Sequence, residues 1–185
     1  MDIVADQLSK RKFPAIGEIG LDFYWDKTFV SQQQLAFNKQ MQWALDYSLP
    51  IVIHTRNAIG ETIEAVKPFA KKGLRGIFHC FSGSKESAEQ IIGMGFHLGL
   101  GGVLTYKNAG VAEAVKDIPM EWLVLETDAP YLSPVPYRGK KNEPAFIIEV
   151  AKKLAEIKNI PLHEVAEITS KNAVKVFLNP DAVML

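Results

Sequence analysis

Four side chains of metal-binding type follow apolar runs that are spread along the 185-residue sequence. Glu18, His54, His79 and Asp128 each come just after such a run, at separations of 36, 25 and 49 residues. Imidazole nitrogens and carboxylate oxygens together suit divalent ions such as Zn²⁺, Mn²⁺ or Mg²⁺. A single histidine after an apolar run is more often a core or loop residue. The prediction of a metal site therefore depends on the recurrence of the pattern.

Other polar residues lie close to these four in sequence. Glu126 is two residues before Asp128 on the same predicted strand, so we expect it to hydrogen-bond a ligand instead of binding the ion itself. Asp22 is either a turn residue or a supporting acid. Arg56 offers a positive charge beside His54, and a guanidinium suits a bound phosphate.

Three residues with reactive side chains are expected to be structural. Cys80 directly follows His79, so strand alternation would point its thiol away from the ligands, as an inert buried group. His97 lies inside a predicted strand, and His163 lies near the start of a predicted helix. We expect neither histidine to bind a metal or a substrate.

The elements that must hold these side chains are predicted to alternate between strand and helix. Continuous apolar strands between helices indicate a parallel sheet covered by helices, either a doubly wound sheet or a (β/α) barrel. In both folds, functional residues gather at the carboxyl ends of the strands. Ser84 is expected to cap one helix, and Pro68 to end or kink another. The predicted strands are 13–20, 50–54, 75–80, 95–102 and 121–128, and the predicted helices are 31–48, 57–72, 84–94, 108–118, 143–159 and 161–178.

Composition and charge narrow the functional class. The 21 basic and 21 acidic residues cancel, so no overall positive field would drive non-specific binding to DNA. Cys80 is the sole cysteine, which excludes an internal disulfide and favours a reducing compartment. No apolar run is long enough to span a bilayer, and the first ten residues do not resemble a signal peptide. We therefore expect a single cytoplasmic domain over residues 1–185, with no membrane partner.

Two segments near the predicted ligands could contact a nucleic acid. The proline-rich segment 127–144 is either a rigid surface loop or a lid beside the site. As a lid it would offer Tyr137 and Arg138, with Lys140 and Lys141, to a phosphate. The aromatic residues at 23–25 follow the first ligand, and one or two of these rings could stack a nucleobase.

Five ordered motifs resemble the TatD family of metal-dependent deoxyribonucleases. They are "GEIGLDFYW", "PIVIHTR", "FHCFSGS", "LVLETDAPYLSP" and "PYRGKKNEP". The resemblance covers the whole chain and implies a (β/α) TIM-type barrel of the metal-dependent hydrolase superfamily. It also implies that Glu18, His54, His79 and Asp128 are ligands of a divalent metal ion, either Mg²⁺, Mn²⁺ or Zn²⁺.

The activity implied by the resemblance is hydrolysis of DNA phosphodiester bonds, typically from a 3′ end and with single-stranded DNA or 3′ ends as substrate. Up to two ions, about 3.5–4 Å apart in such sites, would clamp the phosphoryl group. Asp128 would orient the attacking water or accept its proton, and Glu126 is the second catalytic candidate. Arg56, Tyr137 and Arg138 are the predicted phosphate-binding residues.

The sequence departs from the family pattern at its beginning. The strand with a His-x-His pair, and the βα unit after it, have no counterpart, so we expect a barrel that is incomplete at the N-terminus. One ion would keep Glu18, His54 and His79, whereas its neighbour would keep only Glu18 and Asp128. A second copy of the chain or a missing N-terminal segment could complete the barrel. Three functions remain open: a DNA hydrolase, a hydrolase of another ester or amide, and a catalytically inert scaffold.

Overall fold

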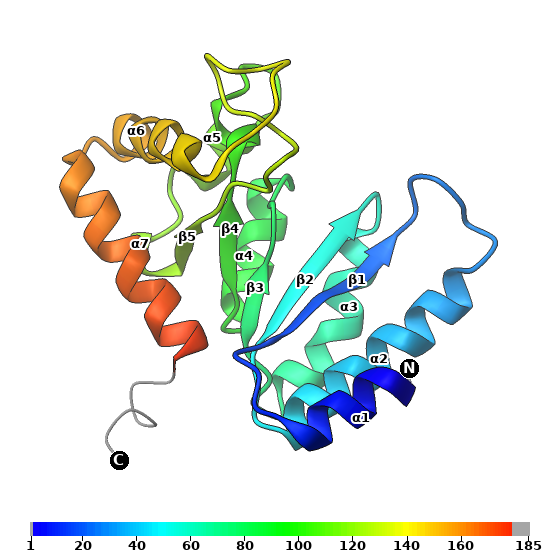
Figure 1. The fold of residues 1–185 in the computed structure, drawn as a ribbon. Coiled ribbons are helices and arrows are strands. Elements are labelled where there is room, and N and C mark those ends of the chain that lie inside the picture. Colours follow the sequence, from blue (N-terminus) through cyan, green and yellow to red (C-terminus); the bar gives the residue numbers. More distant parts are fainter. Residues whose placement is uncertain (1, 179–185) are drawn as a thin grey trace. The chain divides into compact units, whose positions relative to one another are not determined.

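The structure, a computed structural model, describes residues 2–178, in which strands and helices alternate along the chain (Figure 1). The pairs β1–β2 and β4–β5 are parallel. The predicted α/β class with a parallel sheet is confirmed. The strand order in the sheet is β1 (Ile16–Asp22), β2 (Ile51–Arg56), β3 (Gly76–Phe78), β4 (His97–Leu100) and β5 (Leu123–Leu125).

Helices connect the strands and follow the last of them. No helix in residues 2–178 is both long and apolar enough to cross a membrane. Short 3-10 helices cover Gly102–Thr105, Met120–Trp122 and Pro144–Phe146. The α-helices are α1 (Asp2–Lys10), α2 (Val30–Asp46), α3 (Ile59–Ala70), α4 (Lys85–Gly93), α5 (Val111–Val115), α6 (Ile147–Lys158) and α7 (Leu162–Phe177).

The sequence pattern predicts most of these elements, with shifted ends. Ser84 caps α4 as expected, because its Oγ accepts a hydrogen bond from the backbone N–H of Ser87 at 3.3 Å. Pro68 does not end its helix, since α3 continues to Ala70; the alternative expectation, a kink at Pro68, stays a prediction. Pro68 lies in the last turn, and its missing N–H removes one backbone hydrogen bond there without ending the helix. The pattern does not predict α1, in which Leu8 is the one residue that is fully buried.

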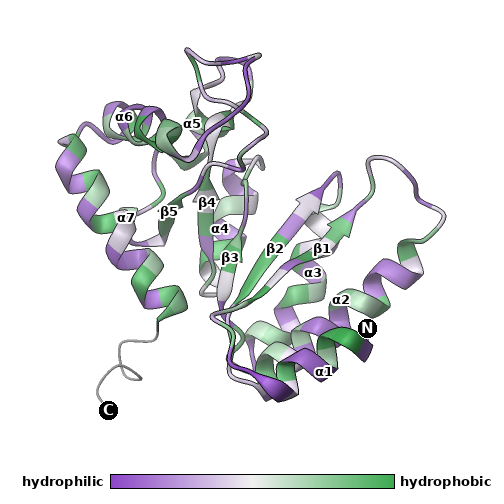
Figure 2. Ribbon diagram, in the orientation of Figure 1, coloured by the Kyte–Doolittle hydropathy of each residue, from purple (hydrophilic) through white to green (hydrophobic). Residues whose placement is uncertain are grey.

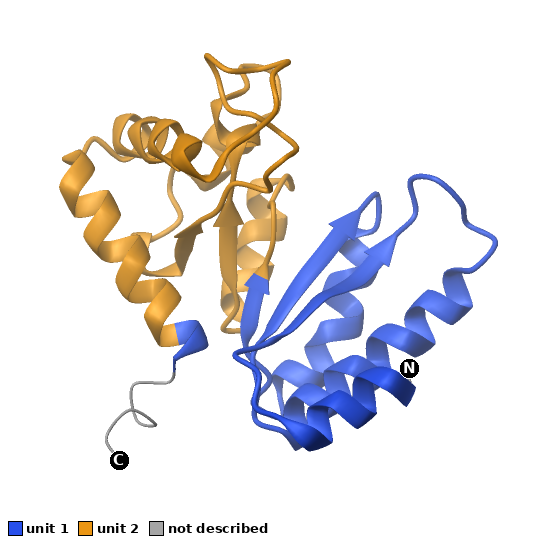
Figure 3. Ribbon diagram, in the orientation of Figure 1, with its two compact units in different colours: residues 1–77, 176–185 blue, residues 78–175 orange. Residues whose placement is uncertain are grey.

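The chain divides into two compact units (Figure 3). Unit 1 comprises residues 1–77 and 176–185, and unit 2 comprises residues 78–175. The division falls within β3. The expectation of a single domain stays a prediction.

Unit 1 buries one face of the β1–β2 pair. Ile19 and Leu21 of β1 and Ile51 and Ile53 of β2 are buried, and β1 contacts α2 and α3. Figure 2 shows the corresponding apolar segments of β1 and β2 in green. Because side chains alternate along a strand, the residues between these apolar ones lie on the opposite face. That face carries the polar side chains of unit 1 described below.

Unit 2 has its own core around β4 and β5. Leu98, Leu100 and Leu123 are fully buried in it. The side-chain amide of Asn172, on α7, donates hydrogen bonds of 2.8 Å to the carbonyl oxygens of Met120 and Leu123. These bonds fix α7 against the start of β5. Buried residues of α6 complete this part of the core: Val150, Ala151 and Leu154.

Lys158 at the end of α6 donates hydrogen bonds to carbonyl oxygens in the last residue of α5 and just after it. Its ammonium donates to the carbonyl oxygens of Val115 and Lys116, at 2.6 and 2.8 Å, and to that of Ile118. We expect Lys158→Met to lower the free energy of unfolding by about 1–3 kcal/mol, because partly buried acceptors lose a charged donor. Urea unfolding monitored by circular dichroism measures the change. Lys153→Met is the control, since its exposed pair with Glu156 contributes little; an equal loss in both variants would contradict this role.

His97 is a buried histidine of unit 2, as the sequence predicts, and lies 5.2 Å from the ring of Trp122. Within residues 2–178 neither ring nitrogen makes a hydrogen bond of normal geometry. Burial lowers the pKa of His97, and the charge of Lys175 lowers it further, while the Glu121 backbone opposes part of this effect. The unfolded chain therefore binds a proton at this residue before the folded chain does.

The lowered pKa predicts a specific pH dependence of stability. As the pH falls through about 6.5, the unfolded histidine is protonated first, so the folded state loses stability until the lower folded pKa is reached. We expect the melting temperature of the His97→Phe variant to change less between pH 7 and pH 5 than that of the wild type. The exposed His163→Asn is the control and should leave the profile unchanged. Parallel profiles for His97→Phe and the wild type would contradict the prediction.

Candidate metal centre

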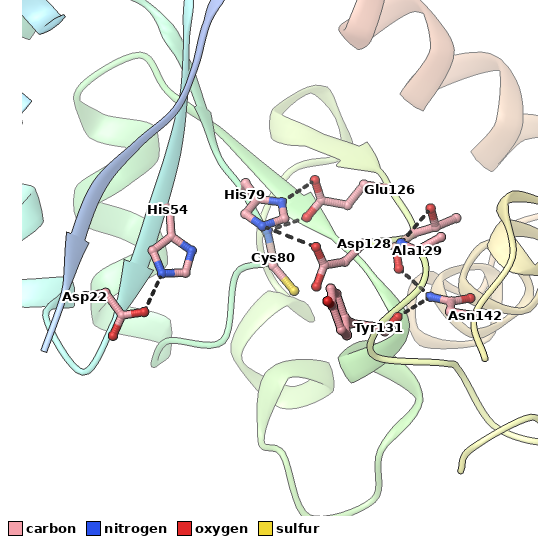
Figure 4. Close-up of polar contacts among 10 residues, drawn as sticks. Asp22, His54, His79, Cys80, Glu126, Asp128, Ala129, Tyr131 and Asn142 are labelled. Carbon is pink, nitrogen blue, oxygen red and sulfur yellow. Dashed lines mark hydrogen bonds and ion pairs between the residues drawn. The ribbon is translucent and has the colours of Figure 1, made fainter. Parts of the chain in front are cut away.

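In unit 1, Asp22 and His54 form a carboxylate–imidazole pair at the ends of β1 and β2. Asp22 Oδ2 lies 3.0 Å from Nε2 of His54 (Figure 4). In the β1–β2 register His54 is opposite Gly20 and Arg56 is opposite Asp22, so Asp22 is placed diagonally to the imidazole. Burial raises the pKa of Asp22, but the Tyr24 N–H, His54 and Arg56 outweigh it and hold that pKa below its usual value. Asp22 therefore contacts both His54 and the backbone N–H of Tyr24, and its role as a supporting acid stays a prediction.

Gly20 makes the close approach of β1 and β2 possible at this point. It has φ +150°, and a Cβ there would lie 1.9 Å from the carbonyl oxygen of His54. Any other residue would both strain the backbone and collide with the neighbouring strand. The glycine thus sets the position of the His54 backbone against β1.

The predicted ligands of unit 1 lie within strands instead of after them. Glu18 is the third residue of β1 and is exposed, and His54 is the fourth residue of β2 and is half-buried. The predicted strands, which end at Gly20 and His54, are each two residues too short at this end. The apolar runs stop earlier than the backbone pairing, which continues to Asp22 and Arg56.

In unit 2, His79 is held between two carboxylates just after β3. Its Nδ1 lies 3.1 Å from Oε2 of Glu126, and its Nε2 lies 3.7 Å from Oδ1 of Asp128 (Figure 4). Glu126 Oε1 also accepts a hydrogen bond from the backbone N–H of Cys80. A carboxylate on one imidazole nitrogen fixes the ring and its tautomer. This is the contact that the sequence predicts for Glu126.

Gly99 leaves the space that the Glu126 carboxylate occupies. A Cβ at Gly99 would lie 2.8–2.9 Å from both carboxylate oxygens of Glu126. The backbone of this part of β4 is also tied in place, because the carbonyl of Gly99 accepts from the N–H of Phe81 at 2.9 Å. Gly99 in β4 is therefore a sequence signal for the position of Glu126.

Cys80 lies beside the ligands, which corrects the sequence prediction. Donor atoms of His79, Cys80 and Asp128 all lie within 4.8 Å of one another, and Cys80 is half-buried. Strand alternation fails here because β3 ends at Phe78 and Cys80 has φ +48°. The thiol is thus turned toward the side that holds His79.

The segment between β5 and α6 is tied down at several points. The buried side-chain amide of Asn142 donates to the carbonyl oxygens of Thr127 and Tyr131, at 2.5 and 2.6 Å. The hydroxyl of Tyr106 donates to the carbonyl of Ser133 at 2.9 Å, and the N–H of Val135 donates to the Thr105 hydroxyl at 2.9 Å. These contacts hold the segment in place, and whether it covers the site as a lid stays a prediction.

The predicted phosphate-binding residues are placed separately. Arg138 is exposed and its guanidinium lies 4.1 Å from the ring centroid of Tyr106. Tyr137 stacks on Phe146, with ring centroids 4.0 Å apart. Arg56 is exposed in unit 1, at the end of β2. Their phosphate-binding roles stay predictions.

The donor set of unit 2 fits a divalent cation. One imidazole nitrogen, one carboxylate and one thiol lie close together, and the second imidazole nitrogen is occupied by Glu126. Such a set offers ligands to Zn²⁺ or Mn²⁺, and its carboxylate also suits Mg²⁺. The ligand roles of Glu18, His54, His79 and Asp128 stay predictions.

Comparison with known proteins shows similarity to one family of metal-dependent hydrolases. A family model described as "TatD related DNase" matches residues 2–178. The chain is 43% identical over 167 residues to the uncharacterized metal-dependent hydrolase YabD of Bacillus subtilis, with 90% of this chain and 66% of that protein covered. It is 34% identical over 164 residues to the uncharacterized metal-dependent hydrolase YcfH of Escherichia coli K12, with 88% and 62% covered. The chain thus spans just under two thirds of the length of these relatives.

A solved structure confirms the fold. The crystal structure of YJJV, a TatD homologue from Escherichia coli, superimposes with a TM-score of 0.89 at 29% sequence identity. The match covers 97% of this chain and 72% of that chain. The predicted TIM-barrel-like architecture is confirmed, over the part of the fold that this chain contains.

Proposed function

Because the chain belongs to the TatD-related family of metal-dependent hydrolases, we propose that it hydrolyses phosphodiester bonds of DNA, from 3′ ends. The proposal rests on the motifs shared with the family and on the site of unit 2. The observation that supports it most directly is that His79 has one nitrogen fixed by Glu126 and the other directed to Asp128. An imidazole held in this way is prepared to bind a cation.

Glu18, His54, His79 and Asp128 would hold the cation, which supplies a Lewis acid and lowers the pKa of bound water toward neutrality. Glu126 keeps the His79 ring in one orientation, and Asp22 does the same for His54.

The remaining residues of the site have roles in proton transfer and charge. Asp128 is the proposed base that orients the attacking water or accepts its proton. Arg56 and Arg138 would neutralise charge on the phosphate, since guanidinium groups match phosphate oxygens. Tyr137 could donate a hydrogen bond to the same group.

A nuclease assay tests the proposal. The full chain is incubated with 5′-labelled single-stranded and duplex oligonucleotides in Mg²⁺, Mn²⁺ or Zn²⁺, and with a panel of other phosphodiesters and amides. We expect metal-dependent shortening of the DNA from its 3′ end, and none in EDTA. If the protein cleaves only an amide or another ester, that compound class replaces DNA as the proposed substrate. Metal binding without any hydrolysis would overturn the proposal in favour of a scaffold.

A further inference from the structure

Unit 1 exposes two aromatic rings and an arginine next to the Asp22–His54 pair. The side chain of Trp25 is 79% exposed and that of Tyr24 is 49% exposed. Their ring centroids are 4.6 Å apart, with the planes almost perpendicular. The guanidinium of Arg56 lies 3.8 Å from the Tyr24 centroid and 5.5 Å from that of Trp25. Two large rings and a cation are thus gathered on one exposed surface, which we call the Trp25 platform.

The segment that carries the platform is anchored by hydrogen bonds. The N–H of Phe23 donates to the carbonyl of Arg56, and the N–H of Tyr24 donates to Asp22 Oδ1, both at 2.9 Å. The Gln33 side chain bonds both the N–H and the carbonyl of Asp22, at 2.8 and 3.0 Å. Asp22, which fixes this segment, also contacts His54. The platform is therefore connected directly to one of the proposed ligands.

The chemistry of the platform indicates what it would bind. An exposed indole next to a guanidinium favours a ligand that has a flat π-system and a negative charge. A nucleotide has both, and its base can stack on a protein ring only when that face is not covered by neighbouring bases. Asp26 lies in the same segment, and its carboxylate accepts a hydrogen bond from the backbone N–H of Thr28 at 2.7 Å.

We propose that the Trp25 platform stacks an unpaired base of single-stranded DNA while Arg56 contacts its phosphate. This rests on the proposed function, because it concerns the DNA that the same site would cleave. The platform would favour single strands and frayed ends over the interior of a duplex. It would act on any base sequence, since every base has a π face.

Binding is measured in EDTA, which separates it from hydrolysis. The probe is a fluorescein-labelled single-stranded oligodeoxynucleotide of ten thymidines, and its counterpart is an abasic strand of the same length and charge. We expect Trp25→Ala to weaken binding of the base-bearing strand by about 5- to 150-fold. Binding of the abasic strand should change little, and Trp25→Phe should retain most of the affinity. Phe29→Ala, which removes another exposed ring of unit 1, should bind as the wild type does.

The outcomes separate this inference from the proposed function. If Trp25→Ala binds both strands as the wild type does, or loses both equally, the platform does not stack bases. The same holds if the wild type binds neither strand, or prefers the abasic strand. If the wild type binds through Trp25 but hydrolyses no DNA, the platform stands and the proposed activity fails. If the wild type cleaves DNA, and the Trp25→Ala variant cleaves and binds DNA equally well, the proposed activity is supported and base stacking on the Trp25 platform is contradicted.

Discussion

Replacing His79 by alanine is expected to lower metal-dependent DNA hydrolysis by at least about a thousandfold. The substitution removes the nitrogen that faces Asp128, and leaves Glu126 without the imidazole that it holds. Removing one neutral hydrogen-bond donor from a transition state already costs roughly 100- to 1,000-fold. Loss of a ligand to a divalent cation removes more charge stabilisation than that. Initial rates on a labelled oligonucleotide measure the effect.

Metal content gives a second readout of the same prediction. Elemental analysis after dialysis should show that His79→Ala has lost metal relative to the wild type, and His54→Ala should show the same loss. His163→Ala on α7 is the control, because it changes an exposed histidine far along the chain from any proposed ligand. Unchanged metal content in both ligand variants would mean that the ligand assignment is wrong.

Replacing Glu126 by glutamine should weaken metal binding and hydrolysis by about 10- to 100-fold, which is less than the effect of losing His79. The amide has almost the same size but no charge, so it would hold the His79 ring and the Cys80 N–H less well. Losses of this size are usual when the group that orients a ligand is changed. Titration with the metal and initial rates measure the two effects separately. Glu156→Gln, on the exposed side of α6, should change neither.

Gly99→Ala tests the same contact without touching a charged residue. Its Cβ would displace the Glu126 carboxylate, so we expect it to reproduce much of the Glu126→Gln defect. Thermal unfolding would show whether the fold is retained. A Gly99→Ala protein with full metal affinity would show that the position of Glu126 is unimportant for metal binding.

The order of elements could be predicted from sequence because each buried segment is continuous and apolar. The runs around Phe78 and Leu98 are typical of strands that are buried on both faces, whereas the run around Ile53 is buried on one face. The helix α1 was not identified, although Ile3, Val4 and Leu8 recur in it at helical spacing; of these three side chains Leu8 alone is buried. The ends of β1 and β2 were placed too early, since Asp22 and Arg56 pair with each other although neither is apolar, whereas the ends of β3, β4 and β5 were placed too late.

The candidate site was predicted in part. The four proposed ligands and Glu126 could be selected from residue type and from their recurrence after apolar runs, and the structure shows the expected Glu126–His79 contact. The place of Cys80 could not be predicted, because alternation presumes an extended chain and Cys80 has a positive φ. The Asp22–His54 contact depends on the register of β1 against β2, which the sequence of neither strand specifies alone.

The close packing at Gly20 has a practical consequence for protein engineering. Gly76, like Gly20, lies so near the main chain of the next strand that a methyl group there would overlap a carbonyl oxygen, that of Ile51. Variant libraries meant to alter selectivity therefore gain nothing from diversifying these two codons. The exposed surface around Trp25 and Arg56 tolerates diversity far better, and it is where randomisation should begin.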